Sequence, residues 1–175
     1  MQSNTAFLII DVQMIMFTKE YPVYMSDVVL ARISDLLRKA RLSNAPVFYI
    51  QHTQNEDMPM AMGKPLWQLH PDLMPCEGET KIMKYTPDCF LETGLDEKLR
   101  SLGIKNLVIT GMQTEICVDT TCRRAFSLGY NVTLVSDAHS TFDTDLLSAD
   151  KIIKHHNNII SSWFGRLSKT EEVIF

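Results

Sequence analysis

Long apolar runs, basic clusters and closely paired cysteines are all missing from this sequence of 175 residues. The first apolar stretch, "AFLIIDV", contains Asp11 and is far too short for the core of a secretion signal or for a membrane span. The net charge is −4 and the lysines and arginines form no cluster, whereas proteins that bind nucleic acid carry a basic patch. We therefore expect a cytoplasmic protein that has neither a membrane nor a nucleic acid as a partner.

The cysteines also lack the spacing of a metal site. None of them forms a CxxC pair, and the intervals between them match no zinc ribbon or zinc finger. In a reducing compartment such residues are free thiols, and most of them are buried packing residues. The four are Cys76, Cys89, Cys117 and Cys122.

Internal repeats, low-complexity tracts and interdomain linkers are absent as well. Apolar residues make up 45% of the chain and charged residues 22%, which is the balance of an ordinary globular protein. A chain of this length can bury one sizeable core. We expect a single domain that spans residues 1–175.

Apolar runs of strand length alternate with segments whose apolar residues recur at helical spacing. Predicted strands cover residues 5–11, 47–51, 81–84, 106–110, 131–136 and 171–175, and predicted helices cover residues 27–43, 93–102, 115–128 and 145–159. This alternation is typical of an α/β protein with a parallel sheet and helices on both faces. Right-handed crossovers make such a sheet doubly wound, and its active sites gather at the carboxyl ends of the strands.

The long connection 52–80 interrupts this alternation. It is rich in proline and has no clear periodicity, and a connection of this length is usually a binding loop, a lid or a disordered segment. Trp67 and Leu69 argue against disorder, because they need a surface to pack on. We therefore expect a lid with a short helix near 65–69, which a neighbouring subunit could complete.

Three residues with chemically useful side chains follow strands of the predicted sheet. Asp11 ends the first strand, Lys84 ends the short third strand, and Cys117 follows the fourth strand after a tight turn. Taken singly, they are as well explained as a capping carboxylate, a solvated lysine and a packing thiol. Thr114 is placed to cap the helix that carries Cys117, and a cysteine near a helix start is favoured as a thiolate. Cys122 lies on the apolar stripe of the same helix and is interpreted as a core residue.

Together, the acid, the lysine and the cysteine could perform covalent acyl transfer. The cysteine would attack a carbonyl group, and the acid would take up the thiol proton and return it to the leaving group. The lysine would keep the carboxylate and the thiolate charged at neutral pH. The backbone N–H groups of Gln113 and Cys117 could bind the oxyanion, and one such donor is worth about 3–4 kcal/mol.

Nearly the whole chain resembles the isochorismatase-like cysteine hydrolases. The resemblance rests on "LIIDVQ" (8–13), "KYTPDCFLETGL" (84–95), "LVITGMQTEICVDTTCRRAFSLGYNVTLVSDAHST" (107–141) and "LSADKIIKHHN" (147–157). It implies that the Asp–Lys–Cys triad of the family falls on Asp11, Lys84 and Cys117. It also implies a non-proline cis peptide bond between Met112 and Gln113, which would aim the Gln113 N–H into the oxyanion hole. The fold implied is a six-stranded parallel sheet with helices on both sides, in a homo-oligomer such as a dimer or tetramer.

Members of this family differ in the bond that they cleave. Amidases such as nicotinamidases and carbamoylsarcosine amidohydrolases keep the cysteine, whereas isochorismatases that cleave a vinyl ether by acid catalysis lack it. Cys117 therefore favours hydrolysis of an amide or carbamoyl C–N bond of a small molecule through a thioester. Two alternatives stay open. One is a vinyl-ether hydrolase that uses Asp11 as its acid, and the other is a non-catalytic binding or redox protein.

Nicotinamidases also carry an Asp-x-His pattern after the second strand and bind a metal. Here Ile50 stands where the acid would be, two residues before His52, and His70 alone does not complete a site. We predict no metal and no other cofactor, and nicotinamide is disfavoured as the substrate. The candidates for the pocket wall, each of which could equally be a packing residue, are Phe17, His52, Trp67, Tyr85, Phe90 and Thr141.

Overall fold

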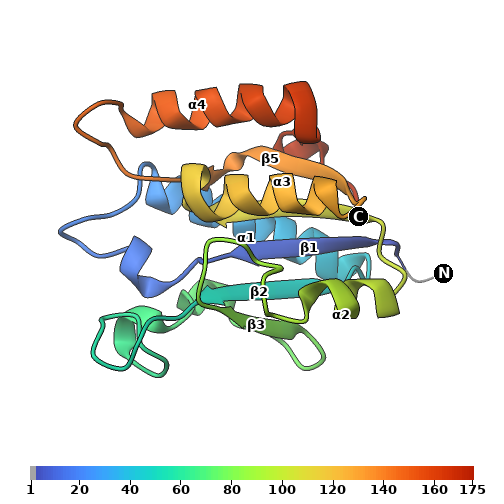
Figure 1. Ribbon diagram of the computed structural model, residues 1–175, viewed down its shortest axis with the longest axis horizontal. Coiled ribbons are helices and arrows are strands. Elements are labelled where there is room, and N and C mark those ends of the chain that lie inside the picture. The colour runs from blue at the N-terminus through green and yellow to red at the C-terminus, as the bar shows by residue number, and fades with distance from the viewer. Residues whose placement is uncertain (1–2) are drawn as a thin grey trace.

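The computed structural model describes residues 3–175, and this part of the chain forms one sheet of six strands. The strands are β1 (Thr5–Ile10), β2 (Val47–His52), β3 (Thr80–Lys84), β4 (Asn106–Met112), β5 (Asn131–Ser140) and β6 (Arg166–Ser168). All neighbouring strands run parallel, in the order β3-β2-β1-β4-β5-β6 (Figure 1). The chain builds the sheet outward from β1 and then returns to the other side of it at β4. The predicted doubly wound α/β fold is therefore confirmed.

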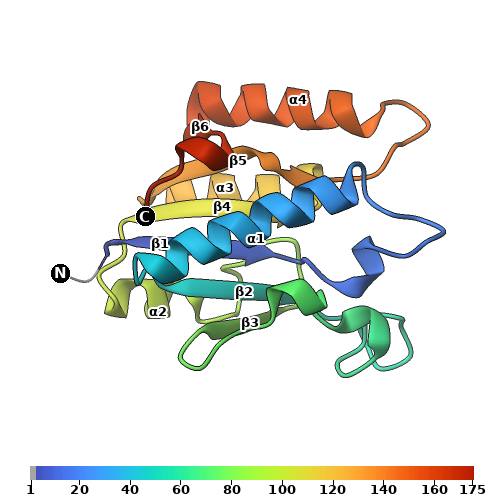
Figure 2. The same cartoon turned by 180° about the vertical axis from the view of Figure 1, so that it is seen from behind.

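Helices cover both faces of this sheet. α2 (Leu95–Ser101) and α3 (Asp119–Ser127) lie on one face and α1 (Ser26–Leu42) on the other, as the two opposite views show (Figure 1 and Figure 2). α4 (Ala149–Ile159) runs along β5. Shorter 3-10 helices cover Met14–Met16, Pro65–Trp67, Pro71–Leu73 and Thr170–Glu172, and π-helical turns cover Thr114–Val118 and Ile160–Phe164. No helix within residues 3–175 combines the length and the apolar character needed to cross a bilayer.

The central strand β1 is buried on both faces and separates two halves of the hydrophobic core. Phe7 and Ile9 pack on the side of α1, and Leu8 and Ile10 pack on the side of α2 and α3. Because neither face of the strand meets water, its sequence is a continuous apolar run rather than an alternating one. Each of these side chains contributes about 1.5–3 kcal/mol by burial.

β4 lies close against β1 at Gly111, which pairs with Ile10 and has no room for a side chain. Gly111 has a φ of +119°, and a side chain at this position would overlap the backbone carbonyl group of Ile10. Only glycine combines this backbone conformation with so close an approach. The contact holds the ends of β1 and β4 together, one residue before Asp11.

The last strand lies at a different place from the predicted one. The sequence predicts a strand over 171–175, whereas β6 is Arg166–Ser168 and the tail continues through a 3-10 helix. Val173 and Phe175 pack into the half of the core that faces α1, and the ring centroid of Phe175 lies 5.4 Å from that of Phe7. The apolar pattern of the tail therefore reflects burial without strand pairing.

Element boundaries also differ near the carboxyl edge of the sheet. The predicted helix 115–128 is divided into the π-helical turn Thr114–Val118 and the regular helix α3. The predicted strand 131–136 continues to Ser140 as part of β5. The short helix predicted in the long connection is present as the 3-10 helix Pro65–Trp67.

Candidate active site

Asp11, Lys84 and Cys117 meet at the carboxyl edge of the sheet. Asp11 follows β1, Lys84 is the last residue of β3, and Cys117 lies in the π-helical turn after β4. The Nζ atom of Lys84 lies 2.7 Å from Oδ2 of Asp11 and 3.2 Å from Sγ of Cys117. Asp11 and Lys84 are each 1% exposed, and Cys117 is 9% exposed. The structure thus brings the three predicted triad residues into one buried cluster.

The ammonium group of Lys84 contacts three polar partners. Besides Asp11 and Cys117, it donates to the carbonyl oxygen of Thr86 at 3.2 Å. A buried ammonium without such partners would be very costly, and a solvated lysine would need none of them. Burial by itself would lower the pKa of Lys84, but Asp11 and the neighbouring thiols raise this pKa above its ordinary value. Lys84 is therefore cationic at neutral pH.

Cys117 is a protonated thiol in this arrangement. Burial, followed by the charge of Asp11, raises the pKa of Cys117 to about 12, and Lys84 only partly offsets the two. The prediction of a thiolate at neutral pH is therefore wrong for the resting site, because loss of hydration outweighs the nearby ammonium. Both carboxylate oxygens of Asp11 are buried and accept no hydrogen bond from the described residues, although Oδ2 forms the ion pair with Lys84. The carboxylate therefore keeps the capacity to accept the thiol proton.

The peptide bond between Met112 and Gln113 is cis. The helical turn that follows it begins differently from the prediction. Gln113, rather than Thr114, is the residue that precedes the helical turn. The hydroxyl group of Thr114 lies 2.8 Å from Nδ1 of His139 and caps no backbone group. Thr114 therefore links the turn to β5 instead of capping the helix.

Two of the predicted pocket residues are His52, which ends β2, and Trp67, which lies in the long connection. His52 pairs in register with Lys84, and its Nδ1 is buried without a hydrogen-bond partner among the described residues. Burial, followed by the charge of Lys84, lowers the pKa of His52, so that its ring is neutral at neutral pH. The indole N–H of Trp67 donates to Oγ1 of Thr53 at 3.0 Å, which holds this side chain beside the end of β2.

Three further candidates for the pocket wall, Phe17, Tyr85 and Thr141, differ from one another in exposure and in the groups that they contact. The ring centroid of Phe17 lies 4.7 Å from that of His70, so these two side chains pack together. Tyr85 is 66% exposed. Thr141 is completely buried, and its hydroxyl group donates to Oε1 of Glu115 at 2.7 Å.

Phe90 belongs to the half of the hydrophobic core that faces α2 and α3. It is 8% exposed, and its ring stacks on Tyr130 with the centroids 6.0 Å apart. Tyr130 precedes β5 and so lies at the amino edge of the sheet, opposite the triad. A role of Phe90 in the substrate pocket stays a prediction, and the segment that carries it runs back along the sheet from β3 toward α2.

Gln13 is a site residue that the sequence analysis did not single out. Its side-chain amide donates to the carbonyl oxygens of His52 at 3.0 Å and Trp67 at 2.7 Å, and its Oε1 accepts from the His52 N–H at 2.9 Å. Gln13 is completely buried. It therefore clamps the segment after β1 to the end of β2 and to the lid. The available signal was an amide side chain within an otherwise buried run, "LIIDVQ".

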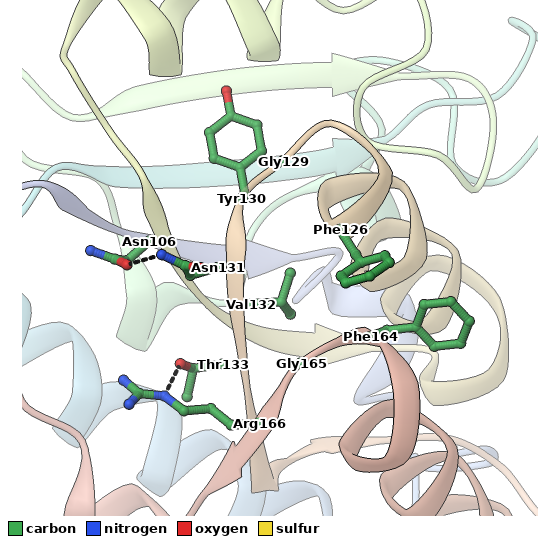
Figure 3. A pocket seen from close by; sticks show the side chains of 10 residues that line it. All are labelled: Asn106, Phe126, Gly129, Tyr130, Asn131, Val132, Thr133, Phe164, Gly165 and Arg166. Atoms are coloured by element: carbon green, nitrogen blue, oxygen red, sulfur yellow. Dashed lines mark hydrogen bonds between the residues drawn. The ribbon is translucent and has the colours of Figure 1, made fainter.

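A hollow of about 720 Å³ lies beyond the ends of β2 and β3, and Tyr85 is the one predicted site residue among those that line it. Its lining includes Thr53, which follows His52, and Tyr85, which follows Lys84. A second hollow, of about 520 Å³, lies at the opposite edge, where β4, β5 and β6 begin (Figure 3). Figure 3 shows Phe126 and Phe164 on one side of it and Arg166 bonded to Thr133 on the other. None of the predicted site residues lines the second hollow.

Metal-binding side chains do not cluster in the described part of the chain. Within residues 3–175, no group of three or more histidine, cysteine, aspartate or glutamate side chains is arranged to hold a metal ion. His70 accepts a hydrogen bond from the N–H of Asp72 through Nδ1 at 3.3 Å. Its ring nitrogen is thus used within its own turn.

A family model described as the isochorismatase domain matches residues 5–159. The chain is 32% identical over 142 residues to the secreted isochorismatase effector Isc1 of Verticillium dahliae, covering 81% of this chain and 75% of that protein. It is 36% identical over 141 residues to streptothricin hydrolase of Streptomyces noursei, covering 79% of this chain and 50% of that protein. It is 32% identical over 113 residues to ureidoacrylate amidohydrolase RutB of Caulobacter vibrioides, covering 65% of this chain and 48% of that protein.

A solved structure shares the whole architecture. The crystal structure of an isochorismatase from Pseudomonas putida KT2440 superimposes with a TM-score of 0.92 at 30% sequence identity. The match covers 98% of this chain and 90% of that one, so it includes all six strands.

Proposed function

The chain belongs to the isochorismatase family of hydrolases, and we propose that it cleaves an amide or carbamoyl C–N bond of a small molecule through a thioester on Cys117. One observation carries this proposal. A single buried ammonium group, that of Lys84, contacts both the Asp11 carboxylate and the Cys117 sulfur. An acid, a nucleophile and a fixed positive charge are the groups that covalent acyl transfer requires. Relatives named as an amidohydrolase and as a streptothricin hydrolase support the reaction class.

Acylation begins when Sγ of Cys117 attacks the substrate carbonyl carbon. Because the pKa of this thiol is about 12, the proton passes to Asp11 as the carbon–sulfur bond forms. Asp11 then gives the proton to the substrate nitrogen, the C–N bond breaks, and the amine or ammonia leaves. The product of this half-reaction is a thioester on Cys117 with Asp11 again a carboxylate.

Hydrolysis of the thioester repeats these steps with water as the nucleophile. Asp11 takes a proton from water as the oxygen attacks the thioester carbonyl, and the carbon–sulfur bond then breaks. The sulfur recovers the proton from Asp11, and a carboxylic acid is released. Lys84 stays protonated throughout and holds the carboxylate beside the sulfur. Backbone N–H groups of Gln113 and Cys117 are proposed to bind the oxyanion, at about 3–4 kcal/mol for one donor.

The substrate is proposed to enter through the hollow at the ends of β2 and β3. His52 and Trp67, whose backbone groups bond to Gln13, are proposed to form the inner wall between this hollow and the triad. We propose a homo-oligomer, a dimer or tetramer, whose neighbouring subunit completes the lid, and light scattering of the purified protein tests this. A cytoplasmic location also stays a prediction, which cell fractionation tests.

A vinyl-ether hydrolase is the second candidate, since one relative is named an isochorismatase effector. In that reaction Asp11 would act as the acid and the sulfur of Cys117 would not be needed. Hydrolysis of isochorismate that survives Cys117→Ser and is lost in Asp11→Asn would establish this alternative. A redox or binding role would show instead as peroxide-dependent modification of Cys117 without turnover of any amide.

Ammonia release from a panel of small primary amides, ureas and carbamates tests the proposed reaction. We expect at least one compound to be hydrolysed by the wild type and not by Cys117→Ala. Cys76→Ala is the matched control, because Cys76 is an exposed free thiol remote from the cluster, and it should retain full activity. Hydrolysis that persists in Cys117→Ala would refute the proposal.

A further inference from the structure

We propose that His139 is a positioning residue that holds the nucleophile turn Thr114–Val118 in its reactive arrangement through the side chain of Thr114. The proposal rests on the proposed function, in which Cys117 of this turn is the nucleophile. His139 is part of β5, and both His139 and Thr114 are 1% exposed. The hydrogen-bond partners of His139 are Thr114 and Asn157, and neither of them belongs to the triad.

Two hydrogen bonds connect α4 to the turn through His139, and a third fixes the side chain of Asn157 to β5. The side-chain amide of Asn157 donates to the carbonyl oxygen of Ser136 at 3.1 Å. Oδ1 of Asn157 lies 3.0 Å from Nε2 of His139. Nδ1 of His139 lies 2.8 Å from Oγ1 of Thr114. The chain of contacts therefore runs from α4 through the end of β5 to the first residue of the turn.

The donor and acceptor roles along this chain follow from one another. Because the NH2 group of Asn157 donates to Ser136, its oxygen faces His139 and accepts the Nε2 proton. Burial lowers the pKa of His139 to about 4, so the ring is neutral at neutral pH and Nδ1 carries a lone pair. The hydroxyl group of Thr114 must therefore donate to Nδ1, which fixes its rotamer.

β5 is shaped so that His139 reaches the turn. The register between β4 and β5 shifts, since Ile109 pairs with Leu134 whereas Gly111 pairs with His139. The surplus residues on β5 bulge out of the pairing, and bulges commonly redirect a side chain next to an active site. The bulge places His139 beside the end of β4, which leads directly into the turn.

Thr114 lies between the two residues proposed to act on the substrate, Gln113 and Cys117. Holding its side chain therefore holds the distance and angle between the sulfur and the oxyanion donors. A misplacement of about 1 Å in such an arrangement can cost a hundredfold in rate. The hydrogen bond from Thr141, which follows β5, to Glu115 holds the next residue of the turn.

The test measures acylation of the enzyme by p-nitrophenyl acetate, read as the burst of p-nitrophenolate and located on Cys117 by peptide mass spectrometry. The variants are His139→Phe, Thr114→Val and the two combined. Thr110→Val is the matched control. Like Thr114, Thr110 is a buried threonine, but it lies within β4 and donates to the carbonyl oxygen of Leu8 at 3.2 Å instead of contacting His139. Alkylation by iodoacetamide verifies that the sulfur remains accessible in each folded variant.

We expect His139→Phe and Thr114→Val each to slow acylation by about 10-fold to 100-fold. The double variant should be no slower than the worse single variant, because both changes break the same link. His139→Asn, whose Oδ1 can accept from Thr114, should recover part of the rate. Additive losses in the double variant, or equal slowing by Thr110→Val, would overturn the proposal. If the wild type itself is never acylated on Cys117, the proposed hydrolase function fails instead.

Discussion

The Lys84 ammonium lies 2.7 Å from the Asp11 carboxylate, and both groups are almost completely buried. Removing one member of a buried ion pair leaves the other uncompensated, at about 3–5 kcal/mol. We therefore expect Asp11→Asn and Lys84→Met each to lower the free energy of unfolding by about that amount. The double variant should lose less than the sum of the two. Urea denaturation of the four proteins measures this coupling, and simple additivity would show that the pair is not an energetic unit.

The same two substitutions should also abolish most of the activity. Loss of a general acid–base group typically costs about 10²–10⁴ in rate. Because the Cys117 thiol is protonated at rest, it has no acceptor for its proton when Asp11 is replaced by asparagine. We expect kcat of Asp11→Asn to fall within that range at pH 7. Asp11→Asn with full kcat would contradict the role given to this carboxylate.

Replacing Gln13 by leucine tests the clamp on the lid. The variant leaves the N–H and the carbonyl oxygen of His52 without their partner, at about 1–3 kcal/mol for each buried group, and removes the shorter of two bonds to the carbonyl oxygen of Trp67. We expect KM to rise about tenfold, while iodoacetamide still alkylates Cys117 at the wild-type rate. Gln51→Leu removes only one bond to Trp67, at 3.1 Å, and should have a smaller effect on KM. Equal effects of the two variants would contradict the clamp.

Gly111→Ala should prevent stable folding. The new methyl group would overlap the Ile10 carbonyl group in the middle of the sheet, so the loss should exceed about 4 kcal/mol. Gly78→Ala is the control, since Gly78 also has a positive φ, of +87°, but has open space where a side chain would lie. Thermal unfolding followed by circular dichroism distinguishes them. A Gly111→Ala protein as stable as Gly78→Ala would show that the two strands can separate at little cost.

Acid should weaken the fold partly through His139. Its pKa is about 4 in the folded protein and near 6.5 in an unfolded chain, so the unfolded state binds the proton first as the pH falls. Stability is therefore lost between about pH 6.5 and 4 and is unaffected by this group above that window. The expected loss from pH 7 to pH 4.5 is about 2 kcal/mol. Urea denaturation at both pH values should show a smaller difference for His139→Asn, and an unchanged difference would exclude this contribution.

The predictable parts of the fold are those that the burial of apolar side chains determines by itself. β1 is recognisable because both of its faces are buried, and α1 because its apolar residues recur on one side. The tail was misassigned because Val173 and Phe175 are buried by the core without pairing to a strand. Apolar residues report burial, and burial alone does not distinguish a strand from a packed tail.

The candidate site also has features that the sequence predicts and features that it does not. The rule that parallel strands end at one edge predicts that Asp11, Lys84 and Cys117 converge. The protonation of Cys117 was predicted wrongly, because it depends on how completely the sulfur is desolvated. The contacts of Gln13 and His139 depend on loop paths and on the bulge in β5, which no local sequence pattern specifies.

The thioester on Cys117 is the central claim, and rapid acid quenching during turnover of a hydrolysed amide tests it most directly. Mass spectrometry of the digested protein should find the peptide that contains Cys117 heavier by the acyl group of the substrate, and Cys117→Ala should show neither adduct nor turnover. Steady turnover with no acyl group on Cys117, or with the group on another residue, would contradict the account.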